Sequence, residues 1–235
     1  MYILEGNIGA GKSTFLNLLA QERPHLSIAL EPLDAWHTNA QGKSLLAHFY
    51  EHPARWAFTM ETFAMACRVT EHLKEQALAN TQRIVERSIY SGHYVFALNG
   101  YTAGFMTALE WELYTQTFNF LIQAKCNAPH GFIYVQTTPH IAYERIKKRK
   151  RSAENAISFD YIAQIHERHE AFLVYKKNLL PDLHAVPVLV IPCDEDFETN
   201  KGFRNACFNA VEEFIQKTHK GMIRTPLRRS PLELF

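Results

Sequence analysis

The chain lacks a long apolar run, and it lacks paired cysteines. Its 235 residues include no stretch of about 18 consecutive apolar side chains, so we expect no membrane span. The first predicted strand is not preceded by the charged region, apolar region and cleavage site of a signal peptide, so we also expect no secretory signal or transit segment. The four cysteines stand far apart without a C-x-x-C pair: Cys67, Cys126, Cys193 and Cys207. This spacing argues against a zinc ribbon or a disulfide framework and predicts reduced thiols in a cytoplasmic protein.

The chain also lacks an excess of charge of either sign. Lysine and arginine together number 25, aspartate and glutamate number 24, and the net charge is +1. Such a balance provides no overall field that would hold nucleic acid or an anionic membrane, so we expect neither as a partner. The 12 histidines are scattered without metal-ligand spacing, and each is expected on the surface or satisfied in the core.

What the sequence does contain is enough apolar material for one domain. With 47% hydrophobic and 21% charged residues, the chain can bury a substantial core. We expect a single domain over residues 1–220. Residues 221–235 carry two prolines and three arginines, which predict an extended tail whose role the sequence does not reveal.

Short apolar runs alternate with longer amphipathic stretches. The runs expected to be strands are 2–4, 26–30, 84–85, 132–135 and 186–191. The stretches expected to be helices are 13–21, 56–80 and a third that begins at Thr138-Pro139 and ends at about residue 150. This alternation predicts an α/β fold with a doubly wound, five-stranded parallel sheet and helices on both faces.

A glycine-rich loop follows the first predicted strand. Residues 6–13 read G-x-x-x-x-G-K-S, the phosphate loop, between a strand and a helix as this motif requires. Its glycines let backbone N–H groups surround a phosphate, Lys12 adds a positive charge, and the Ser13 hydroxyl can ligate Mg²⁺. The motif therefore predicts a nucleoside triphosphate site. Motor proteins, molecular switches and kinases all have such a site, so the motif alone does not distinguish them. The expected ATP contacts in this loop are Gly6, Asn7, Ile8, Gly9, Ala10, Gly11, Lys12, Ser13 and Thr14.

Acidic residues at two further strand ends favour a kinase. Glu31 follows the second predicted strand, and Glu86 and Arg87 follow the third, at the edge where doubly wound sheets form their sites. Glu31 can orient and deprotonate a hydroxyl there, with a helix cap or a magnesium-side ligand as the alternative. Glu86 is expected near the metal and Arg87 near the transferred group, with a purely structural ion pair as the alternative.

A cluster of six cationic residues covers positions 145–151. Arg145 and Arg149 are four residues apart and share a helix face, and Arg151 follows where the helix is expected to end. A solvated basic face or a localisation signal would have the same composition. With a phosphate loop upstream, a lid that closes arginines over the triphosphate is favoured.

Six segments in order resemble the deoxynucleoside kinases of the deoxycytidine, deoxyguanosine and insect multisubstrate group. They are GNIGAGKST, EPLDAW, YEHPARWAFTMETF, ERSIYSGHYVFALN, YVQTTPHIAYERIKKRKRSAEN and CDEDF. The resemblance implies a P-loop kinase fold with an arginine-rich lid. It also implies a homodimer that uses Mg²⁺ to transfer the γ-phosphate of ATP to the 5′-hydroxyl of a deoxynucleoside.

The resemblance assigns roles position by position. It makes Glu31 the base for the 5′-hydroxyl and Arg87 its electrostatic partner, while Lys12, Arg145 and Arg149 act on the phosphates. The further contacts implied with ATP are those of Arg145, Arg149, Arg151, Asp194, Glu195, Asp196 and Phe197. The residues implied to bind the sugar are Tyr50 and Glu154, and those implied around the base are Phe96, Trp36, Ile8 and Met60.

Two positions depart from the family pattern near the base. Glu61 stands where a glutamine usually reads the base, and Gly92 stands where an aspartate usually pairs with the arginine at position 68. An ionised carboxylate only accepts hydrogen bonds, and guanine alone presents two adjacent donors. We therefore predict a preference for deoxyguanosine or a related 6-oxopurine, with Arg68 either paired with Glu61 or donating to guanine O6.

Thymidine or a broad specificity remains the alternative. One donor of thymine could meet Glu61 while Arg68 reaches O4, and a buried, protonated Glu61 would imitate the amide of glutamine. The sequence leaves these possibilities open.

Two other functions share parts of the pattern. A nucleoside monophosphate kinase such as thymidylate kinase has a phosphate loop and an arginine lid, but Glu31 would repel an acceptor phosphate. A noncatalytic nucleotide-binding subunit would be expected to lose Glu31 or the lid arginines, and this chain keeps both. Zinc-containing thymidine kinases are excluded by the absence of cysteine pairs.

Overall fold

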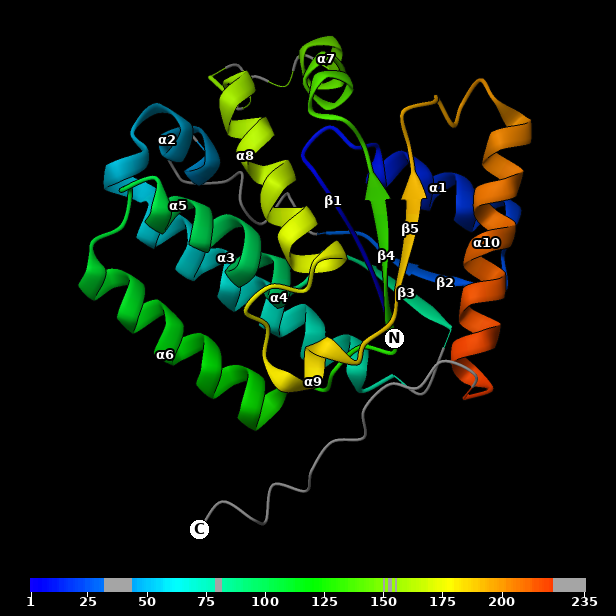
Figure 1. Ribbon diagram of the computed structural model, residues 1–235, viewed down its shortest axis with the longest axis horizontal. Coiled ribbons are helices and arrows are strands. Elements are labelled where there is room, and N and C mark those ends of the chain that lie inside the picture. Colours follow the sequence, from blue (N-terminus) through cyan, green and yellow to red (C-terminus); the bar gives the residue numbers. More distant parts are fainter. Residues whose placement is uncertain (32–43, 79–81, 150, 152–153, 155, 222–235) are drawn as a thin grey trace.

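A five-stranded parallel sheet forms the middle of the molecule in the computed structural model (Figure 1). The structure describes residues 1–31, 44–78, 82–149, 151, 154 and 156–221. The strands are β1 (Tyr2–Gly6), β2 (Ser27–Ala29), β3 (Arg83–Glu86), β4 (Gly131–Gln136) and β5 (Val188–Pro192). They pair in the order β2-β3-β1-β4-β5. The predicted doubly wound α/β sheet is confirmed, with each strand at the expected place in the chain.

The central strand determines where a site can form. All five residues of β1 are buried, and Tyr2 pairs with Ile84 of β3 on one side and Gly131 of β4 on the other. The chain passes from β1 to β2 and β3, then crosses to β4 and β5. The loops after β1 and β3 therefore diverge at the carboxyl end of the sheet, which is where doubly wound sheets bind their ligands.

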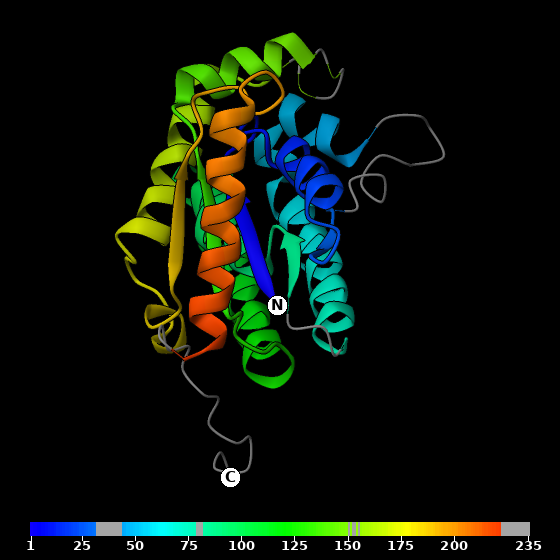
Figure 2. The same ribbon diagram turned by 90° about the vertical axis from the view of Figure 1, so that its right-hand side faces the viewer.

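Helices cover both faces of the sheet. Helices α1 (Lys12–Glu22) and α10 (Lys201–His219) lie on one face, and α10 stands in front of the sheet in Figure 2. The other helical segments are α2 (Leu45–Glu51), α3 (Pro53–Gln76), α4 (Ile89–Ser91), the π-helix η2 (Gly92–Ala97), α5 (Leu98–Thr102), α6 (Ala108–Lys125), α7 (Pro139–Arg149), α8 (Phe159–His169), the π-helix η4 (Glu170–Val174) and α9 (Pro181–His184).

The two faces carry separate apolar cores because side chains alternate along each strand. On β4, Phe132 and Tyr134 belong to the core that packs against α3, α6 and η4. The intervening Ile133 and the next residue, Val135, belong to the core beneath α1 and α10. Both faces of the sheet are thus buried at its central strands, β1 and β4, which explains why these strands read as nearly continuous apolar runs.

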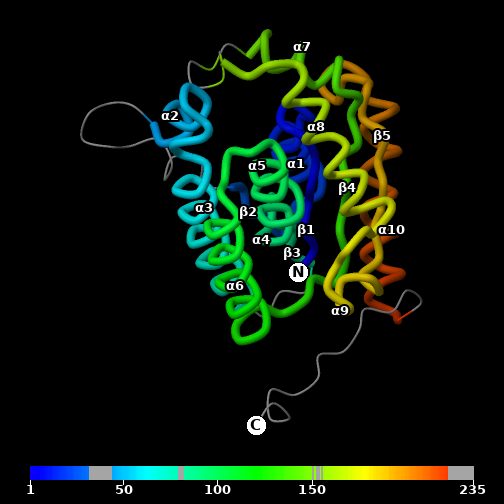
Figure 3. The backbone as a smooth tube through the Cα atoms, turned by 60° about the vertical axis from the view of Figure 1, so that its left-hand side comes forward, coloured from blue at the N-terminus to red at the C-terminus, as the bar shows by residue number. Residues whose placement is uncertain are grey.

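Local sequence determines where the long helices begin. Pro53 is the first of the 24 residues of α3, and the rest of this helix contains neither proline nor glycine. Thr107 and Glu110 form a reciprocal capping box at the start of α6. Helices α3 and α6 lie side by side on the outer side of the molecule (Figure 3).

The expected helix boundaries are mostly reproduced. The first and third predicted helices correspond to α1 and α7. The second begins three residues earlier than expected, and its last residue is Gln76 rather than residue 80. Of the expected tail, residues 222–235 lie outside the described residues. No helix in the described part of the chain has the length and apolar character needed to cross a membrane.

Candidate active site

The phosphate loop joins β1 to α1 at the carboxyl end of the central strand. Gly9 has a φ of 79°, and a Cβ there would collide with the carbonyl oxygen of Ala142, so only glycine fits. Lys12 Nζ donates hydrogen bonds to the carbonyl oxygens of Gly6 (3.1 Å) and Asn7 (2.8 Å). Burial is the main cause that lowers the pKa of Lys12 to about 7. A phosphate anion held in the loop would stabilise its charged form.

Glu86 connects the phosphate loop to the segment after β2. Its Oε1 accepts a hydrogen bond from Ser13 Oγ (3.0 Å), and its Oε2 accepts one from the backbone N–H of Glu31 (3.3 Å). Hydroxyl and carboxylate oxygens are the ligands that Mg²⁺ prefers. This oxygen-only pair of side chains beside the phosphate loop fits the expected Mg²⁺.

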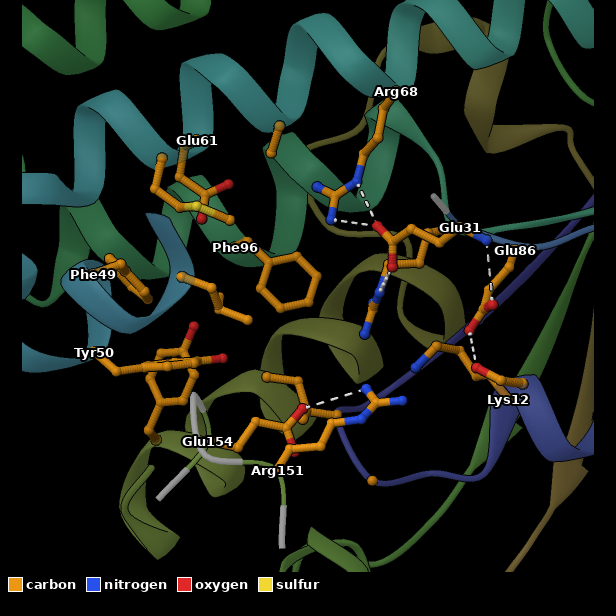
Figure 4. A pocket seen from close by; sticks show the side chains of 18 of the residues that line it. Lys12, Glu31, Phe49, Tyr50, Glu61, Arg68, Glu86, Phe96, Arg151 and Glu154 are labelled. Atoms are coloured by element: carbon orange, nitrogen blue, oxygen red, sulfur yellow. Dashed lines mark hydrogen bonds and ion pairs between the residues drawn. The ribbon is translucent and has the colours of Figure 1, made fainter. Parts of the chain in front are cut away.

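Two arginines hold the carboxylate of Glu31, and Figure 4 shows one of them, Arg68, directed toward it. Arg68 of α3 donates to Glu31 Oε1 from Nε (3.2 Å) and Nη2 (3.0 Å), and Arg87 Nε lies 3.2 Å from Oε2. Only 5% of the Glu31 side chain is exposed. Arg87 has a φ of 63°, a strained conformation for a non-glycine residue that is typical of functional sites.

The pairing of Arg68 was not expected. The sequence left this arginine two roles, pairing with Glu61 or reaching the base. The structure shows a third, because its two short hydrogen bonds go to the expected catalytic carboxylate, Glu31. Arg68 and Glu61 both project from α3 toward the same cavity, and they still interact electrostatically.

Arg145 connects the phosphate loop to the segment around residues 194–197, which is expected to contact ATP. Its Nη1 donates to the carbonyl oxygens of Cys193 (3.0 Å) and Ala10 (3.4 Å). Its Nη2 donates to those of Glu195 (2.9 Å) and Asp194 (3.4 Å). The guanidinium thus binds backbone carbonyl groups on both sides of the place where ATP is expected.

The rest of that segment packs next to the loop. Asp196 Oδ1 accepts a hydrogen bond from the backbone N–H of Glu198 (2.8 Å). The side chain of Phe197 is buried, edge-on to Phe15 at 5.0 Å and stacked on Phe203 at 5.6 Å. Its ring belongs to the core, so contacts of this residue with ATP would come from its backbone groups.

The other two lid arginines meet an acidic partner. Arg149 Nη2 donates to both carboxylate oxygens of Glu154 at 2.6 Å. Arg151 Nη1 lies 3.7 Å from Glu154 Oε1. The residue expected to bind the sugar therefore also holds the arginines expected to bind the phosphates.

Many of the predicted residues line one cavity, whereas Arg145 and residues 194–197 do not line it. About 730 Å³ of space lies between its walls, open solvent at the mouth included. The predicted site residues that line it are Ile8, Gly9, Lys12, Ser13, Glu31, Tyr50, Met60, Glu61, Arg68, Glu86, Arg87, Phe96, Arg149, Arg151 and Glu154. Trp36, which was expected beside the base, lies outside the described residues.

The cavity has chemically distinct ends. In Figure 4, Glu61 lies on the side away from Lys12, with Phe96 between them. Tyr50 and Glu154 form a third side. Burial, together with the charge of Glu154, raises the pKa of Tyr50 well above its usual range, so its hydroxyl remains a hydrogen-bond donor.

The charge of Glu61 depends on pH near neutrality. Its side chain is buried, and this burial is the main cause that raises the pKa of Glu61 to about 7. The positive charges of Arg68 and Arg87 oppose the rise, and the negative charge of Glu31 adds to it. Glu61 can therefore present either a carboxylate or a carboxylic acid to a ligand.

Glu5 and Tyr161 support the site but were not among the residues predicted from the sequence. Glu5 is fully buried, accepts a hydrogen bond from Ser88 Oγ at 2.6 Å, and lies 4.0 Å from Arg87 Nη1. The sequence signal for Glu5 was an acidic residue at the end of an apolar run that was expected to be a strand. Tyr161 lines the cavity and packs edge-on to Tyr50 at 6.1 Å; nothing in its local sequence indicated this.

Comparison with known proteins agrees with this geometry. The family model described as deoxynucleoside kinase matches residues 2–216. The mitochondrial deoxyguanosine kinase of Xenopus laevis is 34% identical over 234 residues, covering 90% of this chain and 88% of the relative. The deoxycytidine kinase of Homo sapiens is 32% identical over 90% and 89% of the two chains.

A third relative extends the range of named substrates. The mitochondrial thymidine kinase 2 of Homo sapiens is 32% identical over 195 residues, covering 83% of this chain and 71% of the relative. The sequence of this chain thus matches one kinase family along nearly its whole length. The same chain has the parallel sheet, the phosphate loop and, beside this loop, the carboxylate of Glu31 held by two arginines. The chain belongs to the deoxynucleoside kinase family.

Proposed function

We propose that this ATP-dependent kinase transfers the γ-phosphate of ATP to the 5′-hydroxyl of a deoxynucleoside bound in the cavity. The observation that carries the proposal is the carboxylate of Glu31, held by Arg68 and Arg87 in the wall of a cavity that also opens onto Lys12. A carboxylate in this place can orient a hydroxyl and accept its proton.

The reaction requires few covalent steps from the protein. The 5′-oxygen bonds to the γ-phosphorus while its proton passes to Glu31, the bond from the γ-phosphorus to the bridging oxygen breaks, and ADP leaves. Lys12 and the backbone N–H groups of the loop stabilise the charge on the phosphate oxygens. Arg87 would lie beside the transferred group, and Arg149 and Arg151 would complete the lid.

Mg²⁺ would be held by Ser13 and Glu86, whose oxygens are 3.0 Å apart. When bound, this ion neutralises charge on the phosphates. The sugar would bind Tyr50 and Glu154 through a free 3′-hydroxyl. Phe96 would stack on the base, with Ile8 and Met60 beside it. In the ATP half of the site, Arg145 would keep the segment from Asp194 to Phe197 against the phosphate loop.

For the base, we propose deoxyguanosine or a related 6-oxopurine. The relatives act, by name, on deoxyguanosine, deoxycytidine and thymidine, so the choice must be argued from this chain. Glu61 faces the cavity at the end away from the phosphate loop. As a carboxylate it can accept from both N1–H and the 2-amino group of guanine, whereas adenine and cytosine would place a ring-nitrogen lone pair against it.

A panel of acceptors tests this function. With ATP and Mg²⁺, deoxyguanosine is expected to show the highest kcat/KM among the four deoxynucleosides, and the corresponding monophosphates are expected not to be phosphorylated. ATP consumption should depend on added nucleoside. Phosphorylation of a monophosphate in place of the nucleoside, or ATP consumption that ignores the nucleoside, would overturn the proposal.

We also propose a homodimer that forms through the outer face of α3 and α6. Four large apolar side chains are exposed there: Phe63 (41%), Leu109 (65%), Leu113 (47%) and Phe120 (64%). The last three share one face of α6, because they are four and seven residues apart. An exposed apolar patch of this kind suits a two-fold interface that uses the same surface on both subunits.

Replacing Phe120 with lysine is expected to weaken this dimer by about tenfold or more, because a charge would be buried within the patch. Sedimentation of the variant at micromolar concentration measures the effect. Tyr175→Lys is the matched control, since Tyr175 is also 64% exposed and lies elsewhere; this variant should remain dimeric. A Phe120→Lys protein that stays dimeric would contradict the assignment.

We further propose that residues 1–220 form one catalytic domain, since the family model matches nearly all of this range. The cytoplasm remains a prediction from the sequence. Two of the relatives described above carry mitochondrial names.

A further inference from the structure

We infer that Arg68 is a positioning residue for the base Glu31, and that glycine at position 92 keeps it in that role. The inference rests on the proposed function, because it concerns the same carboxylate. It assigns Arg68 to the chemical step and leaves the reading of the nucleobase to Glu61.

The contacts of Arg68 show how it acts on Glu31. Its Nε and Nη2 both donate to Oε1, at 3.2 and 3.0 Å, while Arg87 Nε approaches Oε2 at 3.2 Å. The Arg68 side chain is only 8% exposed. The two guanidinium groups therefore fix both oxygens of one carboxylate, and they leave an oxygen lone pair for a hydroxyl of the substrate.

The ring of Phe96 supports both arginines. The guanidinium carbon of Arg87 lies 4.7 Å from the centre of this ring, and that of Arg68 lies 5.5 Å from it. An aromatic face at these distances attracts each cation. The arrangement around Glu31 is thus held from the side of the nucleoside cavity as well as from α3.

Gly92 provides the space that Arg68 occupies. A Cβ at this position would lie 3.0 Å from Arg68 Nη1, so any larger residue would push the guanidinium. The backbone of Gly92 does not itself require glycine, because its φ of −51° and ψ of −51° are helical. The role of glycine here is therefore to leave room, and an acidic side chain would compete with Glu31 for Arg68.

This arrangement predicts which kinetic constant depends on Arg68. If it orients the carboxylate that receives the proton, its loss lowers kcat by a similar factor for every deoxynucleoside, because the 5′-hydroxyl is common to all of them. If it instead reads the base, its loss changes the relative kcat/KM of the bases. The two roles thus give different patterns across the same four substrates.

The test introduces a competitor for Arg68. Gly92→Asp is expected to lower kcat about 10- to 100-fold for all four deoxynucleosides, while the ratios of their kcat/KM values change less than about threefold. Gly92→Asn introduces a side chain of the same size without the charge, and it should lower kcat less than Gly92→Asp does. In an Arg68→Met background, Gly92→Asp should add less than about a threefold loss, because the group that it captures is gone.

Several outcomes would overturn the inference. Arg68 would have no role in the chemical step if Gly92→Asp lowered kcat only for some of the four deoxynucleosides. The same conclusion would follow if the effects of Gly92→Asp and Arg68→Met on kcat were fully additive. Thermal unfolding shows whether Gly92→Asp folds. If it does not, Arg68→Lys and Arg68→Met provide the test: the lysine variant should keep a larger part of kcat than the methionine variant, with KM unchanged. An equal loss of kcat in both variants would contradict the positioning role. A wild-type chain that phosphorylates no deoxynucleoside would instead overturn the proposed function itself.

Discussion

Replacing Glu31 with glutamine is expected to lower kcat for the preferred deoxynucleoside by about 100- to 10,000-fold, the usual contribution of a general base. The amide keeps the shape of the side chain but cannot take up the proton of the 5′-hydroxyl. Because the amide can still hydrogen-bond this hydroxyl, KM should change much less than kcat. Steady-state kinetics with saturating ATP and Mg²⁺ measure both constants.

A matched control makes this result specific. Glu213→Gln makes the same change on α10, where the side chain is 64% exposed and pairs with Lys217, and it should leave kcat unchanged. Thermal unfolding of the Glu31→Gln protein checks that the carboxylate between Arg68 and Arg87 is not needed for folding. A well-folded Glu31→Gln enzyme that retains more than about a tenth of wild-type kcat would remove Glu31 from the role of base.

Replacing Glu61 with glutamine is expected to move base preference away from guanine. The amide donates one hydrogen bond and accepts one, so it matches the edges of adenine and cytosine that the carboxylate opposes. The ratio of kcat/KM for deoxyguanosine to that for deoxyadenosine or deoxycytidine should fall by about 5- to 150-fold, the effect of relieving one mismatched buried polar group. Competition between pairs of deoxynucleosides measures this ratio directly.

The control for Glu61 comes from the same helix. Glu71→Gln changes another glutamate of α3, ten residues further on, whose side chain pairs with Lys74, and it should not alter the ratio. If Glu61→Gln leaves the relative kcat/KM of all four bases unchanged, the base is read by other residues.

The same residue predicts a dependence of base choice on pH. Burial raises the pKa of Glu61 to about 7, so the acid form dominates below this pH and the carboxylate dominates above it. The acid form has a donor and an acceptor, as glutamine does. Selectivity for deoxyguanosine should therefore rise from pH 6 to pH 8 in the wild type and stay flat in Glu61→Gln. An equal rise in both proteins would assign the effect to another group.

Much of this molecule could be predicted because its signals are local. The phosphate loop needs glycines, Lys12 and Ser13 within a few residues, and the strand before it and the helix after it have their own patterns. The positions of Glu31, Glu86 and Arg87 could be predicted because strand ends of a parallel sheet meet at one edge. In the structure, Glu86 Oε2 accepts a hydrogen bond from the backbone N–H of Glu31, and Arg87 pairs with the Glu31 carboxylate.

The contacts that could not be predicted join residues far apart in the chain. Arg68 meets Glu31 across 37 positions, and the rotation of α3 that makes this possible depends on how its apolar face packs. Arg145 binds backbone carbonyl groups nearly 50 positions away, although its spacing from Arg149 suggested that both would face phosphates. Side-chain partners of long cations depend on tertiary packing, which local periodicity does not determine.

The most direct test of the account is a structure with a deoxynucleoside and ADP bound together. We expect the Glu31 carboxylate within about 2.6 to 3.2 Å of the 5′-oxygen, with that oxygen directed toward the β-phosphate of ADP in the loop at Lys12. A 5′-oxygen beyond reach of Glu31, even through one water molecule, would contradict it.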